Sequence, residues 1–311
     1  MNFPSVVLAD LWGIHSPVER TTLGVSRTTW RVGQGFWLTR CDNERGEAFS
    51  RECSLLHALA ETAKADPGLL LIVPSLIPAR SGDVVSMHSD SLWRLTRHID
   101  GLHPSPNNPA TYDLMLNVLL RLHRAFDLTS NECPTFPNIV GRVRDRLSQL
   151  PNTISRSSFA HKERDILHEA ANWLKPRLDR LSIFPTRLVH GDWTPLNVLM
   201  RCDGRAGILD FEACGRGPAV LDFANMCSTL LMWSRLDNMS ERIATFVSSF
   251  GEKTGVPIGL DIIHISMLTH WVGHYFDWRE REATDENTEV LRRLLGRIET
   301  VLYFAAKSAD M

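Results

Sequence analysis

The sequence predicts an α+β protein with two lobes: a small N-terminal lobe with a mixed antiparallel sheet, and a larger, mainly helical C-terminal lobe. Strand-forming runs around one helical segment fill the first part of the chain, whereas amphipathic helical patterns dominate from Thr111 onward. Segment 188–212 is an exception, because it has strand character inside the helical part. We therefore expect an N-terminal lobe over residues 1–100 and a C-terminal lobe over residues 101–311.

Length and composition are those of an ordinary globular protein. The 311 residues are 43% hydrophobic and 23% charged, with a formal net charge of −2. Because basic residues are not in excess, neither nucleic acid nor a membrane surface is an expected partner. No run reaches the ~18 apolar residues of a membrane span, and the N-terminus lacks the basic start of a signal peptide. The six scattered cysteines are typical of reduced thiols, so we expect a soluble cytoplasmic protein.

The N-terminal lobe is predicted from its strands and a single helix. Strand-forming runs cover residues 28–32, 35–40, 69–85 and 91–99, and the first two suggest a hairpin. Residues 46–63 carry apolar side chains at helical spacing, among them Phe49, Cys53 and Leu56. The stretch 98–110, which contains three prolines, is the expected connection between the lobes.

The C-terminal lobe is predicted from repeated helical periodicity. Helical patterns cover residues 111–126, 138–150, 162–181, 219–235, 243–254, 262–281 and 288–306. The chain shows no internal repeat and no low-complexity segment. The strand-like segment 188–212 interrupts this helical pattern.

Within that segment, Asp203-Gly204 predicts a two-residue hairpin turn. If this dipeptide forms the loop, Met200 faces Gly207, and Asn197 faces Asp210 with Cβ atoms about 5 Å apart. An amide and a carboxylate at that distance can share a hard cation, and Mg²⁺ suits such sparse ligation because substrate phosphates complete its shell.

Asp192 lies five residues before Asn197, in a loop that Pro195 stiffens. A carboxylate placed near a metal site can accept the proton of an attacking hydroxyl. One acid for the nucleophile and an Asn/Asp pair for the metal are what phosphoryl transfer requires. The structural alternative to this catalytic role is that Asp192 is a turn or N-cap aspartate.

The motif resembles a known family. His190-Gly191-Asp192, four residues, Asn197 and then Asp210-Phe211-Glu212 are similar to the catalytic and metal loops of the aminoglycoside phosphotransferase/choline kinase-like family, which has a protein-kinase-like fold. The resemblance spans about residues 21–236. It implies that Asp192 is the catalytic base, that Asn197 and Asp210 are the metal ligands, and that ATP or GTP is the phosphate donor.

The resemblance also implies a nucleotide site in the N-terminal lobe. Glu52 matches the helix glutamate that pairs with a strand lysine, and residues Arg97 to Ile99 match the hinge that meets adenine. At the lysine position this chain has Thr39, with Arg40 one residue later on the opposite strand face. A bulge or one-residue shift would bring Arg40 inward to pair with Glu52. The glycine-rich phosphate loop is reduced to Gly24.

Other polar residues have structural readings. We expect His190 to brace its loop and Glu212 to be either a surface acid or a support of the site. We expect Asp222 to be structural, either as a cap or by tying down the loop that contains Gly215 and Gly217. His270 and His274 are spaced like metal ligands, but a third ligand is missing, so core or pocket histidines are expected.

Three aromatic residues of the C-terminal helical pattern lie near two acids: Trp271, Tyr275 and Trp278 near Asp277 and Glu280. Packing in the core is the simpler interpretation of these aromatic residues. The alternative is that they form a wall that binds a cationic acceptor.

The sequence therefore predicts a phosphotransferase that uses Mg²⁺ and acts on a hydroxyl of a small molecule. The acceptor stays open among an aminoglycoside or other antibiotic, choline, homoserine and a sugar. An alternative from another class is a catalytically silent, nucleotide-binding pseudokinase, which Thr39 in place of lysine favours. Oligomeric state does not follow from the sequence.

Overall fold

The chain folds into two units, each built from separate segments of the sequence. The computed structural model describes residues 3–21, 27–42, 45–108, 110–129, 135–156, 160–233, 239–280 and 285–309. Unit 1 comprises Met1–His103, Arg124–Thr135 and Leu196–Glu212. Unit 2 comprises Pro104–His123, Phe136–Pro195 and Ala213–Met311.

An antiparallel sheet forms the centre of unit 1. Its strands, in spatial order, are β1 (Val18–Arg20), β2 (Thr28–Val32), β3 (Phe36–Asp42), β7 (Ser91–Arg97) and β5 (Leu76–Ile77), with β6 (Ser86–His88) also paired to β7. The hairpin predicted for β2 and β3 is confirmed, with Val32 paired to Phe36 across the turn. β7 pairs with the other edge of β3 along its whole length.

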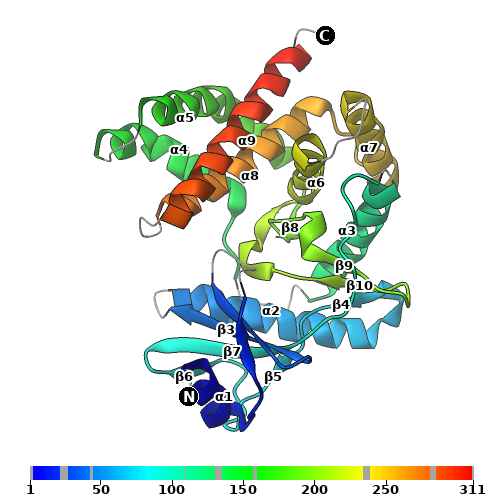
Figure 1. Cartoon of the computed structure of the whole chain (residues 1–311). Helices are drawn as coiled ribbons and strands as arrows, with labels where there is room; N and C mark the ends of the chain where they lie inside the picture. Colours follow the sequence, from blue (N-terminus) through cyan, green and yellow to red (C-terminus); the bar gives the residue numbers. More distant parts are fainter. Residues whose placement is uncertain are drawn as a thin grey trace. The chain divides into compact units, whose positions relative to one another are not determined.

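Two helices cover the two faces of this sheet (Figure 1). On one face α1 (Phe3–Trp12) packs Leu8 and Trp12 against Trp30 and Trp93. On the other, α2 (Gly46–Ala65) packs Phe49 against the sheet. The sequence predicted α2 but not α1, whose ten residues lack a clear polar face.

A second, small sheet contains the hairpin of the motif. β9 (Val198–Met200) and β10 (Ala206–Ile208) are antiparallel, and β10 also pairs in parallel with β4 (Leu71–Ile72). Because of this pairing the hairpin belongs to unit 1, whereas the sequence assigned it to the C-terminal lobe.

Unit 2 is mainly helical, as predicted. Its elements are α3 (Ala110–Thr129, shared with unit 1), α4 (Ile139–Arg156), α5 (His161–Leu174), the 3₁₀ segment η3 (Lys175–Ile183), β8 (Thr186–Val189), β11 (Gly215–Pro218), α6 (Val220–Trp233), α7 (Met239–Thr254), α8 (Leu260–Arg279) and α9 (Asp285–Ala309). The helix expected at 162–181 is divided into α5 and η3 at the residue before Pro176.

Helix α8 lies in the core of unit 2. It is apolar on almost every side and contacts α4, α5, α6 and α9, and α9 runs beside it (Figure 1). Among the described residues, no helix combines the length and the apolar character that crossing a bilayer requires.

Candidate active site

The β9–β10 hairpin turns through three residues instead of two. The N–H of Gly204 donates to the carbonyl of Arg201 (3.2 Å), and Gly204 has a φ of +79°. A glycine in this left-handed conformation is typical of three-residue hairpin loops. Met200 therefore pairs with Ala206 and not with Gly207, so the predicted register is wrong by one residue.

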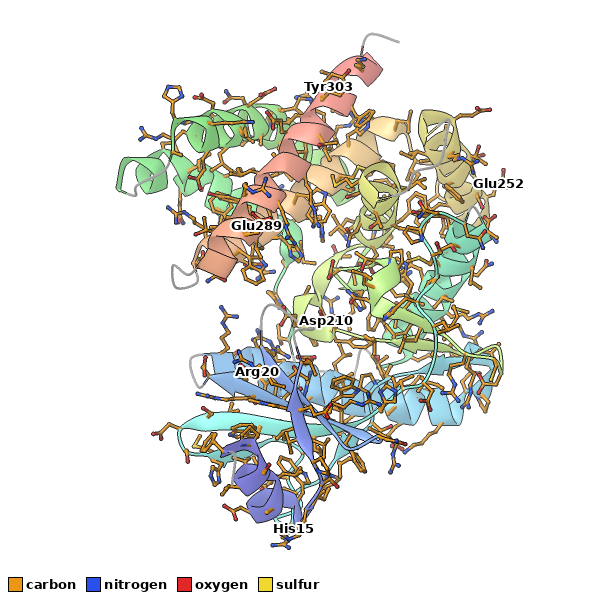
Figure 2. The ribbon with its side chains drawn as sticks, in the orientation of Figure 1. His15, Arg20, Asp210, Glu252, Glu289 and Tyr303 are labelled. Atoms are coloured by element: carbon orange, nitrogen blue, oxygen red, sulfur yellow. The ribbon has the colours of Figure 1, made fainter. Side chains whose placement is uncertain are left out.

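Asn197 and Asp210 consequently do not face each other as a strand pair. The N–H of Leu209 donates to the carbonyl of Asn197 (2.9 Å), which places Leu209 in that position. Asp210 follows with a φ of +59°, a conformation rare for residues other than glycine but enriched in Asp and Asn (Asp210 is labelled in Figure 2). Backbone strain of this kind clusters at functional sites.

The Asn197/Asp210 pair is chemically suited to a divalent cation. Asn197 is buried at the end of a 3₁₀ turn (Pro195–Asn197), and Asp210 is exposed. Phe211, which follows Asp210, is buried with its ring edge-on to Phe126 and so anchors the segment. Oxygen ligands from one carboxylate and one amide fit Mg²⁺, which takes its other ligands from phosphates and water.

Asp222, in α6, holds the loop that contains the H-G-D motif. Its buried carboxylate accepts hydrogen bonds from the backbone N–H groups of His190 and Gly191 (2.8 Å each), and it lies 2.8 Å from His123 Nε2. Burial alone would raise the pKa of Asp222, but the hydrogen bond and charge of His123 lower it. The predicted structural role of Asp222 is confirmed, but the loop that its side chain holds is the one with His190 and Gly191, not the one with Gly215 and Gly217.

Gly191 is required at its position by both conformation and space. Its φ is +80°, and a Cβ added there would lie 2.1 Å from the carbonyl oxygen of Ala213. The neighbouring His190 is fully buried, and its Nδ1 accepts the N–H of Asp192 (3.3 Å). His190 thus braces the loop, as the sequence predicted.

The carboxylate of Asp192 is half-buried and is held by α6. Asn225 Nδ2 donates to Asp192 Oδ1 (3.4 Å). Asn225 lies three residues after Asp222, on the same face of the helix, so one helical turn positions both the loop and the acid. Asn225 was not predicted from the sequence, although its spacing from Asp222 (D-x-x-N) was a usable signal.

Glu52 is buried in α2 and pairs with two arginines. Arg94 Nη2 lies 2.9 Å from Glu52 Oε1, and the guanidinium group of Arg27 contacts the other oxygen. The expected pairing with Arg40 is wrong, because Arg40 Nε donates to Ser91 Oγ (3.0 Å) instead.

Strand register explains this exchange of partners. Thr39 is paired with Arg94 across the β3–β7 ladder, and the two side chains share the sheet face toward α2. Arg40 projects from the opposite face of β3. A neighbouring strand thus supplies the cation that β3 itself lacks.

Charge pairing stabilises this cluster. Burial alone would raise the pKa of Glu52, but the charges of Arg94 and Arg27 lower it to about 2. Both guanidinium groups lie about 5 Å from the centre of the Phe49 ring. Arg27 Nε also lies 3.4 Å from Glu212, so this acid supports the cluster.

The expected adenine hinge follows β7. The N–H of Arg97 donates to the carbonyl of Ser75 (2.9 Å), and the Arg97 side chain is exposed. Ile99 is buried against Gly207, where a Cβ would lie 2.7 Å from the Ile99 side chain. Contact of Arg97 and Ile99 with adenine stays a prediction, and Gly24 lies outside the described residues.

Comparison with solved structures identifies the fold. The amicoumacin kinase hAmiN, in complex with AMP-PNP, Ca²⁺ and Ami, is 15% identical, with a TM-score of 0.69 and coverage of 96% of this chain and 94% of that chain. A thermostable mutant of the aminoglycoside phosphotransferase APH(4)-Ia is 15% identical, with a TM-score of 0.67 and coverage of 97% and 99%. The aminoglycoside phosphotransferase APH(3'')-Id from Streptomyces rimosus, in complex with ADP and streptomycin, is 17% identical, with a TM-score of 0.60 and coverage of 87% and 97%. These likenesses show a protein-kinase-like fold.

A family model identifies the protein family of this chain. The APH model, described as the phosphotransferase enzyme family, matches residues 18–252. No curated protein matches the sequence. The matched residues include the H-G-D motif, Asn197, Asp210 and the Glu52 cluster. Because the model covers most of the chain, this protein belongs to the phosphotransferase enzyme family.

Proposed function

We propose that this protein is a small-molecule kinase that transfers the γ-phosphate of ATP or GTP to a hydroxyl group of its acceptor. The observation that carries the proposal is the hydrogen bond between Leu209 and Asn197 (2.9 Å). It makes neighbours of the two chain segments that bear the Asn197 amide and the Asp210 carboxylate. Solved structures of the same fold, bound to AMP-PNP or ADP, support a nucleotide donor.

Asn197 and Asp210 would hold the Mg²⁺ ion of the nucleotide. When bound, this ion neutralises charge on the phosphates. The left-handed backbone of Asp210 sets the direction of its carboxylate, and burial restricts the Asn197 side chain. The Asn197 amide would then lose little freedom when it binds the ion.

Asp192 would orient the acceptor hydroxyl and accept its proton. Asp222 fixes the backbone before Asp192, and Asn225 holds one of its carboxylate oxygens. A prepositioned base lowers the entropic barrier of the reaction, which is the main contribution a protein makes to phosphoryl transfer.

Arg27 and Arg94 would contact the nucleotide phosphates in place of a strand lysine. Guanidinium groups bind phosphate oxygens in a bidentate manner, and Glu52 holds both arginines in position. Arg97 and Ile99 would adjoin the adenine. Arg40 does not belong to this set, because its side chain donates to Ser91 on the opposite sheet face.

Substitution of Asp192 tests the proposal. Asp192→Asn keeps the shape of the side chain but removes the proton acceptor, so acceptor-dependent ADP or GDP release should fall by about 10²- to 10⁴-fold. Stabilisation by Mg-nucleotide in a thermal-shift assay should persist. Asp145→Asn, an exposed change in the same unit, is the matched control and should be neutral. A variant at Asp192 that keeps the wild-type rate would refute the base assignment.

The second candidate is a catalytically silent, nucleotide-binding pseudokinase. Thr39 at the lysine position favours it, whereas Arg94 paired opposite Thr39 favours the active enzyme. A thermal-shift screen with Mg-ATP and Mg-GTP, followed by a release assay over antibiotic, amino-alcohol, hydroxy-acid and sugar acceptors, separates the two. Nucleotide binding without turnover of any acceptor class would favour the pseudokinase.

A further inference from the structure

Helix α8 supplies histidine and aromatic side chains next to the Asp192 loop. His274 Nε2 lies 3.4 Å from the carbonyl oxygen of Gly191, the residue before Asp192. The His270 ring centre lies 4.3 Å from those of both His274 and Trp271. These rings form one contiguous wall within unit 2.

Helix α9 adds a cation to this wall. The Arg297 guanidinium group lies 4.4 Å from the centre of the Trp271 ring, and its side chain is partly exposed. Burial lowers the pKa of Arg297, and the negative charge of Asp192 acts in the opposite direction. Contacts place Arg297 near the Asp192 loop as well, because the Trp271 ring beneath it lies 6.3 Å from the ring of His274, which contacts Gly191.

The acids at the C-terminal end of α8, Asp277 and the following Glu280, are already neutralised by arginine. Arg146 binds Asp277 (2.6 Å) and Glu280 (3.0 Å), and the face of Trp271 is occupied by Arg297. The sequence suggested Trp271, Asp277 and Glu280 as part of a binding site for a cationic acceptor. These residues already contact arginines of this chain. A polycationic acceptor would meet like charge at Arg297.

A buried polar atom in the wall also lacks a partner. His270 is 6% exposed, and its Nε2 atom has no hydrogen-bond partner among the described residues. Buried polar atoms are almost always satisfied, so an atom without a partner beside His274, which contacts the Asp192 loop, points to a polar ligand.

We propose, on the basis of the kinase function above, that the acceptor is a hydroxy acid whose carboxylate is bound by Arg297 while its hydroxyl is received by Asp192. A guanidinium group matches a carboxylate with two parallel hydrogen bonds. Arg297 therefore determines specificity, selecting an anionic acceptor over the polycationic aminoglycosides.

The test compares acceptors that differ only in charge. A panel of small hydroxy acids is assayed for ADP or GDP release beside the matching primary amides and amino alcohols, with hygromycin B and streptomycin as polycations. Hydroxy acids should show kcat/KM at least about tenfold above their amides, since loss of one charge-assisted contact typically costs that much. Preference for the amino alcohols or the aminoglycosides would overturn the inference.

Substitution of Arg297 assigns the effect to its residue. Arg297→Gln should raise KM for the hydroxy acid by about 10- to 100-fold with kcat changed little, and Arg297→Lys should restore part of the loss. Arg292→Gln, an exposed change on the same helix that loses its pair with Glu289, is the control. A uniform fall in kcat for every acceptor would mean that Arg297 acts on Asp192 and would overturn the inference.

The outcomes separate the two proposals. Turnover of amines but not hydroxy acids refutes the acceptor class and leaves the kinase function intact. Mg-nucleotide binding without turnover of any acceptor refutes the kinase function, and the acceptor inference with it. The comparison of acceptors uses the wild-type protein, so it holds even if a variant at Arg297 fails to fold.

Discussion

At the scale of single residues, the H-G-D motif is explained by what surrounds it. Asp222 keeps a negative charge in a fully buried position because two backbone N–H groups and His123 compensate for lost hydration. Gly191 accommodates the carbonyl of Ala213, which leaves no room for a side chain. Asp192, the proposed base, therefore follows a loop whose backbone has little freedom.

Gly191→Ala should be among the most destabilising single changes in this loop. The added Cβ would meet a backbone oxygen at 2.1 Å in addition to the cost of a positive φ, and we expect a loss of about 2–4 kcal/mol in the free energy of unfolding. Urea unfolding measures it. Gly255→Ala is the control, because Gly255 has a φ of +70° but open space around it, so only about 1 kcal/mol should be lost. Equal losses in both variants would contradict the steric explanation.

At the scale of elements, strand register decides which side chains form the site. A third residue in the β9–β10 loop shifts the ladder so that Leu209, not Asp210, meets Asn197. Pairing between β3 and β7 places Arg94 opposite Thr39 and brings a cation to Glu52. The shift in the β9–β10 ladder is a single residue, and Arg40 differs from Thr39 by a single position. In a strand, one position is enough to move a side chain to the other face of the sheet.

The ion pairs of Glu52 with Arg94 and Arg27 should make the free energy of unfolding depend on pH in the acidic range. The folded pKa of Glu52, about 2, is below its ordinary value of 4.5, so its contribution is present above about pH 5 and is lost as the pH falls toward 2. Glu52→Gln should lower the free energy of unfolding by about 3–5 kcal/mol at pH 7, because two buried charges lose their partner. It should also flatten the pH dependence between pH 5 and 2.

Chemical unfolding at several pH values measures this effect. Glu47→Gln, an exposed change on the same helix, is the control, since surface ion pairs contribute little. If the free energy of unfolding depends on pH in the same way in both variants, the Glu52 cluster does not stabilise the fold in the way described.

At the scale of the whole molecule, both units are assembled from interleaved segments. Unit 1 takes the hairpin at 196–212 from the second half of the chain, because β10 completes its pairing with β4. The proposed phosphate and metal residues therefore all belong to unit 1. The proposed base and Arg297 belong to unit 2.

Because the proposed metal ligands and the proposed base belong to different units, a variant in unit 1 should lose Mg²⁺-dependent nucleotide binding, whereas a variant of the base should not. Mg-ATP at about 100 times its Kd should stabilise the native protein by about 2.7 kcal/mol and raise Tm by a few degrees. Asp210→Asn should remove the Mg²⁺-dependent part of the shift, as should EDTA. Asp203→Asn, at the exposed tip of the same hairpin, is the control and should keep the full shift. An unchanged Mg²⁺ dependence in the Asp210 variant would exclude it as a ligand.

The sequence by itself determined the elements and the motif residues, because hydrophobic periodicity and turn residues act over a few neighbouring positions. It predicted α2, the β2–β3 hairpin, the helices of unit 2 and the bracing role of His190. Only the tertiary structure decided the partners of Glu52 and Asp222, the contact of Asn225 with Asp192, and the pairing of β4 with β10. These features join residues 25 to 135 positions apart or depend on strand register, and both follow from packing of distant segments that local patterns do not encode.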